Sequence, residues 1–306
     1  MTLKKSIASW FNSESIDSNL NDDRIDWARI IPFIGLHLAC LAVVWVGISW
    51  IAVVVAVLSY LIRMFAITAF YHRYFSHRTF KTSRPVQFFF ALIGAASTQR
   101  GPLWWSAHHR HHHKSADREE DPHSPRHGFL WSHMGWFLSR KHFATDYSQI
   151  PDLIKYPELR ILDRYDLLVP VLYAIGMFLL GVVLNAAFPA LGTSGWQLLV
   201  WGYFISTVAL IHVTLTINSL AHVWGQRRYA TSDDSRNNWF LALLTLGEGW
   251  HNNHHHYPGS SRQGFYWWEV DVSYYLLRMM SWVGLVRELK SVPEVIRRAR
   301  RIESVG

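Results

Sequence analysis

Two adjacent apolar stretches decide the fold: residues 167–187 read LLVPVLYAIGMFLLGVVLNAA, and residues 196–215 read WQLLVWGYFISTVALIHVTL. No Asp, Glu, Lys or Arg occurs between Asp166 and Arg227. A helix needs ~20 mostly apolar residues to cross a bilayer. The sequence therefore predicts two transmembrane helices here, joined by a turn over Pro189–Gly195 that is rich in Pro, Gly and Ser.

A second uncharged run extends from Arg29 to Arg63. It predicts two shorter spans, Ile31–Val46 and Trp50–Ala69, with a turn at Gly47–Ser49. The second of these helices then continues past Arg63, whose long side chain we expect to reach the headgroups. The alternative is one long tilted helix, which would place the segments before and after it on opposite sides of the membrane.

The distribution of charge predicts the orientation. Both short turns lack Lys and Arg, so the basic residues fall in the N-terminal, central and C-terminal segments. The positive-inside rule places these three segments in the cytoplasm. A net charge of +8 then serves contact with anionic headgroups rather than with nucleic acid. Because Cys40 is the only cysteine, a disulfide framework and a thiolate metal site are excluded.

These observations predict an all-α integral membrane protein. Four transmembrane helices form two hairpins beneath a cytoplasmic helical cap, and residues 1–306 make one domain. That domain consists of a polar segment at 1–28, a core at about 30–285 and a basic tail at 286–306. Two further stretches, Val86–Thr98 and Phe129–Phe143, predict helices that lie in the interface or pack inside the cap.

Three histidine-rich motifs flank the apolar stretches. His72 and His77 form an HxxxxH motif, and residues 109–113 and 251–255 each contain an HxxHH pattern. Eight of the chain's 18 histidines occupy these patterns. Neutral imidazole is the commonest nitrogen ligand for transition metals. Since eight imidazoles exceed the need of one ion, the motifs predict a dimetal site, on which the cap closes.

The spacing within the motifs supports shared ligation. Residues three and four apart lie on one face of a helix, so motifs 109–113 and 251–255 each present three imidazoles to one side. Two such faces can close on a metal pair. His72 and His77 are five residues apart and do not share a face of a straight α-helix. They require a helix end between them, or they serve different metals.

The remaining histidines stand outside these motifs. His37 and His212 lie within predicted spans, and for them we favour a packing role over ligation. Metal ligands usually need hydrogen-bond partners of their own. Such partners, residues lining the site, or plain surface positions are expected among His108, His111, His123, His127, His133, His142 and His256.

The surroundings of the motifs favour redox chemistry. A closed histidine cage could also be purely structural. At a membrane surface rich in Trp and Phe, however, the expected substrate is apolar, and an unreactive C–H bond needs a strong oxidant. A metal pair and dioxygen can supply one. Zinc cannot change its redox state, so iron is the favoured metal.

Together with the segment Asn218-Ser-Leu-Ala-His222, the three motifs resemble those of the membrane fatty acyl desaturases, specifically the stearoyl-CoA desaturase type in its bacterial form. The segments QRGPLWWSAHHR at 99–110 and EDPHSP at 120–125 are similar to those of that family. The resemblance implies two iron ions, with Asn218 binding through a water molecule. It also implies nine histidine ligands: His72, His77, His109, His112, His113, His222, His251, His254 and His255.

The resemblance further implies the reaction. It is oxygen-dependent desaturation of a saturated acyl chain, by default that of an acyl-CoA at the delta-9 position, to a cis-monounsaturated product. Electrons come from a separate iron–sulfur or haem protein and its reductase, for which the basic cap offers a docking surface. Arg140 and Lys141 fall where the family places cations for coenzyme A phosphates; anchoring to lipid headgroups is the alternative. We expect a bacterial inner membrane, with the site and both termini cytoplasmic.

Two other functions compete with desaturation. A hydroxylase on the same scaffold would need the same oxidant and one fewer hydrogen abstraction. A metal transporter or storage protein would carry polar ligands at mid-depth in the membrane. The spans contain His37 and His212 but no carboxylates, so transport is the weaker alternative.

Overall fold

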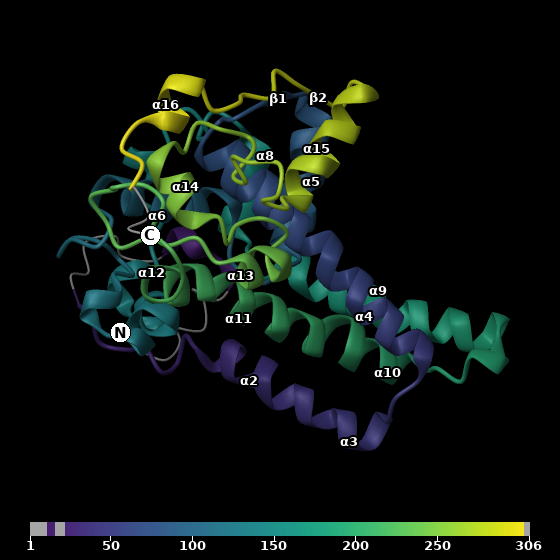
Figure 1. Cartoon of the computed structure of the whole chain (residues 1–306). Coiled ribbons are helices and arrows are strands. Elements are labelled where there is room, and N and C mark those ends of the chain that lie inside the picture. Colours follow the sequence, from purple (N-terminus) through teal and green to yellow (C-terminus); the bar gives the residue numbers. More distant parts are fainter. Residues whose placement is uncertain (1–10, 16–21, 303–306) are drawn as a thin grey trace.

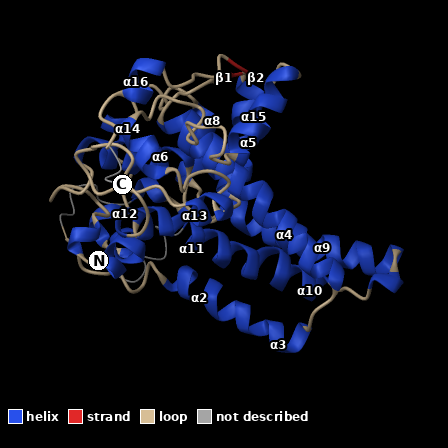
Figure 2. Ribbon diagram, in the orientation of Figure 1, coloured by secondary structure: helices blue, strands red, loops and turns tan. Residues whose placement is uncertain are grey.

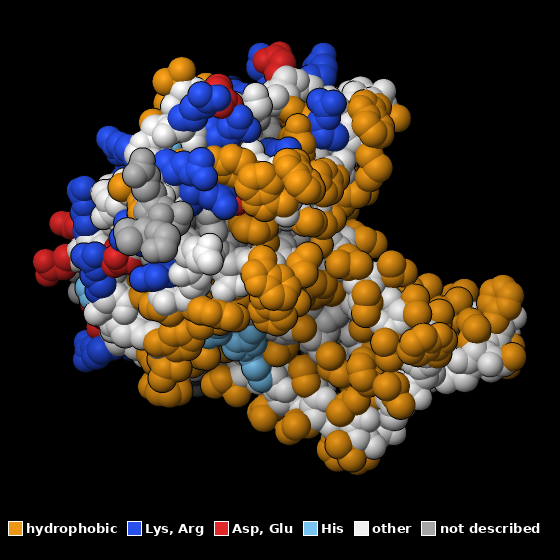
Figure 3. Space-filling view, in the orientation of Figure 1, with side chains coloured by type: hydrophobic (Ala, Val, Ile, Leu, Met, Phe, Trp, Pro, Cys, Tyr) orange, Lys and Arg blue, Asp and Glu red, His pale blue; other side chains and the backbone are white. Residues whose placement is uncertain are grey.

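The computed structural model describes residues 11–15 and 22–302, and most of the predicted polar segment 1–28 lies outside them. Helices make up almost all of the regular structure (Figure 2). They form an elongated stem that projects from a rounded cap (Figure 1). Hydrophobic side chains cover the stem, whereas Lys and Arg gather on the cap (Figure 3).

The helices of the stem include four that the sequence predicts as spans. In chain order they are α2 (Ile31–Ala39), η2 (Cys40–Ala42), α3 (Val43–Val46), α4 (Trp50–Phe65), η3 (Ala66–Ser76), α9 (Leu168–Ala187), η8 (Pro189–Leu191), α10 (Gly195–Leu198), η9 (Leu199–Ile205), α11 (Ser206–Asn218) and α12 (Leu220–Val223).

The cap is built from shorter elements. They are η1 (Ser13–Ser15), β1 (Lys81–Thr82), α5 (Arg84–Ala95), α6 (Pro102–Ser115), η4 (Pro125–His127), η5 (Trp131–Gly135), α7 (Trp136–Leu138), η6 (Arg140–His142), η7 (Tyr147–Gln149), α8 (Pro157–Arg164), α13 (Trp239–Leu244), α14 (His251–His256), α15 (Val272–Trp282), β2 (Val286–Arg287) and α16 (Glu294–Arg298). Strand β1 pairs antiparallel with β2 and ties the C-terminal part of the chain to the segment after the first histidine motif.

Three continuous helices are long and apolar enough to cross a membrane: Trp50–Ser76, Leu168–Ala187 and Gly195–Val223. They confirm three of the predicted spans, and two of them continue further into the cap than expected. The fourth predicted span, Ile31–Val46, is an apolar helix that falls short of this length. A 3-10 turn over Cys40–Ala42 interrupts it.

The prediction of a hairpin at the start of the stem is confirmed, and the single tilted helix is wrong. Helix α3 ends at Gly47, which has a φ of 65°. The side chain of Ser49 then caps α4 by accepting a hydrogen bond from the backbone of Ala52. Figure 1 shows α2 and α3 running outward along the stem and α4 returning toward the cap.

Close helix packing holds the stem together. Ser59 of α4 hydrogen-bonds the Tyr173 hydroxyl of α9 at 2.7 Å and donates to the carbonyl of Gly202 in η9 at 2.7 Å. A Cβ on Gly181 would lie only 2.3 Å from the backbone oxygen of Ser194, so α9 and the start of α10 approach each other through a glycine. Small residues and interhelical hydrogen bonds of this kind join helices where surrounding lipid weakens the hydrophobic drive.

The expectation that Arg63 reaches the headgroups is wrong. Its side chain is buried between helices, with 1 % of its surface exposed. The guanidinium donates to the hydroxyls of Ser206 and Thr207, each at 2.5 Å, and to the carbonyl oxygen of Ala96 at 3.1 Å. These acceptors replace the water and headgroups that a cation would otherwise seek, so Arg63 clamps α4 to α11 and to the end of α5.

Replacement of Arg63 by Met should destabilise the protein strongly, because the two hydroxyls and the carbonyl would stay buried without a donor. We expect a loss of roughly 3 kcal/mol in the free energy of unfolding, measured by thermal unfolding in detergent. Arg84→Met, which removes an exposed ion pair with Glu158, should cost less than about 1 kcal/mol. Equal losses would contradict the role of Arg63 as a clamp.

Candidate dimetal site

The nine histidines that the sequence predicts as ligands come together at the junction of stem and cap. They arrive on η3, α6, α12 and α14, with His77 directly after η3. Within each of two groups the nearest side-chain nitrogens lie no more than 4.8 Å apart, close enough to hold a metal ion. One group contains His72, His77, His109, His113 and His254, and the other contains His112, His222, His251 and His255.

The local form of the helix explains how His72 and His77 meet. Residues Ala66–Ser76 form a π-helix, in which backbone hydrogen bonds join residues five apart. The amide of His77 donates to the carbonyl of His72 at 3.2 Å, and the two ring centroids lie 5.0 Å apart. Of the two alternatives for this spacing, the structure supports one shared group, with the helix ending just before His77.

Helices α6 and α14 each serve both groups. His112 and His113 are neighbours in sequence and point into different groups. The Nε2 atom of His113 lies 2.9 Å from that of His254, and the Nε2 atom of His112 lies 3.4 Å from that of His255. The two HxxHH faces therefore close on a pair of sites, as the spacing predicts.

Four carboxylates hold the outer nitrogens of these rings. The Nδ1 atom of His112 lies 2.9 Å from Asp121, that of His222 lies 2.8 Å from Asp117, and that of His255 lies 3.0 Å from Asp233. Glu248 forms the same contact with His72. These carboxylates were not predicted. Asp117 and Asp121 lie just after the second motif and Glu248 lies just before the third, where a search for partners could have found them, although not the rings that they hold; Asp233 gives no such signal in the sequence.

The donor set fits a metal ion. An ionised carboxylate only accepts hydrogen bonds, so each of these four rings carries its proton on Nδ1 and leaves a lone pair on Nε2. The Nε2 lone pairs of His222 and His72 point at the Nε2 atoms of His251 and His254, and the two nitrogens of each pair lie 3.0 Å apart. A cation placed there could be bound by several of these nitrogens at once.

The electrostatics of the rings agree with ligation. Burial lowers the pKa of His109, His113 and His254 well below the ordinary value for imidazole, and neighbouring imidazoles act in the same direction. Neutral imidazole is the form that binds metal. His112 differs: burial lowers its pKa, but the charge and the hydrogen bond of Asp121, together with the charges of Asp117 and Asp233, outweigh burial and raise it.

The other histidines lie outside the two groups. His123 forms a third cluster with Asp121 and His112, but Asp121 already contacts Nδ1 of His112. His123 is therefore an outer contact of the site. His256 stacks on Tyr229 with ring centroids 3.9 Å apart. His37 and His212 hydrogen-bond each other away from both groups, which agrees with the favoured packing role.

Arg140 and Lys141 lie on the cap in η6, away from these clusters. The Arg140 side chain forms an ion pair with Asp22 at 3.3 Å, and the Lys141 ammonium lies 3.9 Å from Asp23. Both side chains are partly exposed. An anionic ligand could therefore reach them in competition with the carboxylates.

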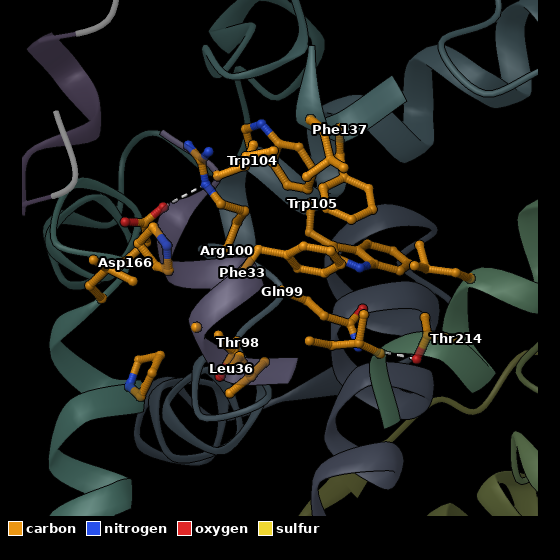
Figure 4. Close-up of a pocket in the computed structure, with 18 of the residues that line it drawn as sticks. Phe33, Leu36, Thr98, Gln99, Arg100, Trp104, Trp105, Phe137, Asp166 and Thr214 are labelled. Carbon is orange, nitrogen blue, oxygen red and sulfur yellow. Dashed lines mark hydrogen bonds and ion pairs between the residues drawn. The ribbon is translucent and has the colours of Figure 1, made fainter. Parts of the chain in front are cut away.

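A cavity of about 720 Å³ runs from the histidines into the stem. Aromatic and aliphatic side chains line most of it, including Phe33, Trp105 and Phe137 (Figure 4). At its cap end Arg100 forms an ion pair with Asp166 at 2.5 Å. His109 and Asn218 belong to its wall, which places the cavity directly beside the metal-ligand candidates.

A second, smaller cavity of about 40 Å³ lies on the other side of the same wall. The two cavities share Trp105, His109, Thr214 and Asn218. Near this shared wall the Gln99 amide donates to the Thr214 hydroxyl at 3.1 Å (Figure 4). The large cavity borders the group of five at His109, and the small cavity borders both groups, at His72 and at His112.

Histidine groups that could hold metal ions thus lie beside an apolar cavity and next to helices long enough to cross a membrane, and comparison with known proteins makes the class of protein specific. The fatty acid desaturase family model matches residues 48–288. The chain belongs to the fatty acid desaturase family, whose members are enzymes.

Named relatives cover most of the chain. The sn-1 stearoyl-lipid 9-desaturase of Anabaena variabilis is 36% identical over 273 residues, which are 87% of this chain and 94% of that protein. Acyl-CoA 5-desaturase AL21 of Anemone leveillei is 34% identical over 94% of this chain and 89% of its own length. Delta-9 acyl-lipid desaturase 1 of Arabidopsis thaliana is 36% identical over 90% of this chain and 87% of its length.

Removal of one carboxylate should weaken metal binding without unfolding the protein. We expect Asp233→Asn to lower metal affinity by about 10- to 100-fold, because the amide no longer fixes the protonation and orientation of His255. Elemental analysis after titration with a competing chelator measures this. Asp234→Asn alters the adjacent, exposed carboxylate, which pairs with Arg126, and should leave metal affinity unchanged. Equal affinities for the two variants would contradict the role of Asp233.

Proposed function

We propose that this protein desaturates a saturated fatty acyl chain with dioxygen, at two iron ions held by its histidines. The observation that carries this proposal is the position of the two histidine groups against the two cavities. His109 lines the large cavity, and His72, His109, His112 and His251 line the small one. The expected product is a cis-monounsaturated chain, with the double bond at delta-9 by default. The family, and the desaturase names of its relatives, support this reaction class.

The proposed ligands are the two histidine groups. Five imidazoles would hold one iron and four would hold the other, and Asn218 would complete the smaller set through a water molecule. Asn218 ends α11 and lines both cavities, a position that suits this role. Bound iron would supply the redox chemistry that turns dioxygen and two electrons into an oxidant for unactivated C–H bonds.

The chain's own residues would position the substrate. The apolar walls exclude water from the acyl chain and from the site. Trp105 and Thr214, shared by the two cavities, would hold the reacting methylenes beside the histidines. The Gln99–Thr214 hydrogen bond would fix the wall where the two cavities meet. Which carbons react is then decided by the length of chain that fits beyond this wall, in the small cavity.

The polar end of the substrate would remain at the cap. Arg29 lines the cavity mouth together with Arg100 and the carboxylate of Asp166, so this mouth carries an excess of positive charge. For an acyl-CoA, Arg140 and Lys141 are the proposed contacts of the coenzyme A phosphates, in place of their present aspartate partners. Relatives that act on acyl-CoA and on acyl-lipid make an acyl lipid the alternative carrier.

The proposed setting is a bacterial inner membrane with the cap and both termini in the cytoplasm. Four spans would cross it, with the interrupted helix Ile31–Val46 as the first. The band of apolar side chains on the stem and the basic residues on the cap support this orientation (Figure 3). The basic cap would also dock an acidic iron–sulfur or haem protein as electron donor.

Loss of one proposed ligand should abolish the reaction. The wild type and His113→Ala are expressed in a host that lacks its own desaturase, and the fatty acids are profiled by gas chromatography with mass spectrometry. We expect a new monounsaturated acid from the wild type and none from His113→Ala, whose metal content should also fall. His111→Ala is the control, since His111 belongs to neither group, and its product should match the wild type.

Other outcomes would decide against the proposal. A hydroxy acid in place of the unsaturated acid would assign the protein as a hydroxylase. No product from metal-loaded wild-type protein with an electron donor would reject both oxygenase functions.

The small cavity should control chain length. Met64 lines it from α4, and Ile67 and Thr68 line it from η3. Met64→Ala would enlarge this space, so the preferred substrate should become longer by about two carbons. Competition between saturated chains of different length measures the preference. Met177→Ala, at a methionine of α9 outside both cavities, should leave the preference unchanged; a shift in both variants would contradict the assignment of this wall.

A further inference from the structure

The large cavity has one side that is open to the exterior of the stem. Gly35 of α2, Val171 and Ile175 of α9, and Trp196 of α10 all line the cavity, and all four are exposed. None of these residues is charged. They belong to the apolar helices of the stem, so in a bilayer the open side faces acyl chains rather than water.

Helix α2 forms one edge of this opening, and one polar contact joins it to a neighbouring helix. Leu36 is its only buried residue. Within the described part of the chain, the single side-chain hydrogen bond from α2 to another helix joins Nε2 of His37 to Nε2 of His212 at 2.9 Å. Since lipid competes with apolar helix contacts, a hydrogen bond between helices contributes to holding them together in the stem.

This contact belongs to a longer chain of hydrogen bonds. His37 Nδ1 lies 2.8 Å from the carbonyl oxygen of Phe33, which can only accept. His37 Nε2 must then accept from His212, while His212 Nδ1 lies 3.0 Å from His133 Nε2, and His133 Nδ1 lies 3.0 Å from the Ser219 hydroxyl. Every ring nitrogen in this chain has a partner. The chain therefore ties α2 to α11 and to η5 of the cap.

We propose that the acyl chain passes between the cavity and the bilayer through the opening between α2 and α9, and that His37 and His212 are positioning residues that hold α2 as its fixed edge. This rests on the proposed desaturase function. The polar end of the substrate would stay near Arg29 while its apolar chain moves sideways into the cavity. The chain then meets apolar surface throughout and does not cross water.

Two glycines allow a matched test of the opening. A Cβ built on Gly35 or on Gly176 meets no atom within 4 Å, and both residues are exposed on stem helices. Only Gly35 lines the cavity. The Gly35→Trp and Gly176→Trp variants should therefore fold equally well, but only Gly35→Trp would obstruct the opening.

The experiment uses full-length protein in phospholipid vesicles with dioxygen and a reduced electron donor. The substrate is stearoyl-CoA or distearoyl phosphatidylcholine, whichever the wild type desaturates. We expect Gly35→Trp to lower the rate at least about tenfold and Gly176→Trp to remain within about twofold of the wild type. Equal rates in the two variants would overturn the side opening.

The role of His37 has its own readout. His37→Leu should raise KM and broaden the product to neighbouring double-bond positions, because α2 no longer has a fixed place; His37→Gln, which keeps a hydrogen-bonding end, should restore part of the selectivity. His127→Leu, on the exposed cap surface, is the control. One unchanged product position in His37→Leu would overturn the positioning role. A wild type without product would instead reject the proposed function and this role with it.

Discussion

Four carboxylates orient the histidine rings on which the site depends. Asp117, Asp121, Asp233 and Glu248 each face an Nδ1 atom and so direct the opposite nitrogen inward. Without them the rings could turn or exchange tautomers, and the Nε2 atoms would not converge. The same contacts leave the Nε2 lone pairs of these four rings free to bind a cation.

The membrane stem supplies the frame for this arrangement. The helix from Trp50 to Ser76 ends as a π-helix and delivers His72 into the cap. Helix α11 ends at Asn218, which lines both cavities. Arg63 clamps this helix to α4. An apolar cavity runs beside these helices. The metal-ligand candidates therefore lie at the junction between the apolar stem and the cap.

Much of the site could be predicted from sequence because histidine spacing is a local property. The HxxHH faces follow from helix geometry alone, and the structure closes them on two groups as expected. His222 is different: its isolated position gives no local signal, and only the resemblance to a family indicated it. Asp233 and Glu248 are distant in sequence from the rings they hold, so they required the fold.

The sequence predicted the features of the fold that depend on composition, such as the stem helices. It was less accurate for features that depend on packing between distant segments. Uncharged runs located the stem helices, including the hairpin turn at Gly47. The shortening of the first span by a 3-10 turn has no clear sequence signal. The burial of Arg63 was mispredicted because its acceptors, Ser206 and Thr207, lie more than 140 residues away in the chain. Hydropathy does not register such partners.

The most direct test of the account is to locate the metals. Anomalous diffraction at the iron absorption edge, from crystals of iron-loaded protein, would show their number and positions. The account predicts two peaks, one enclosed by the group of five histidines and one by the group of four. A single peak, or a peak between His112 and His123 beside Asp121, would contradict it.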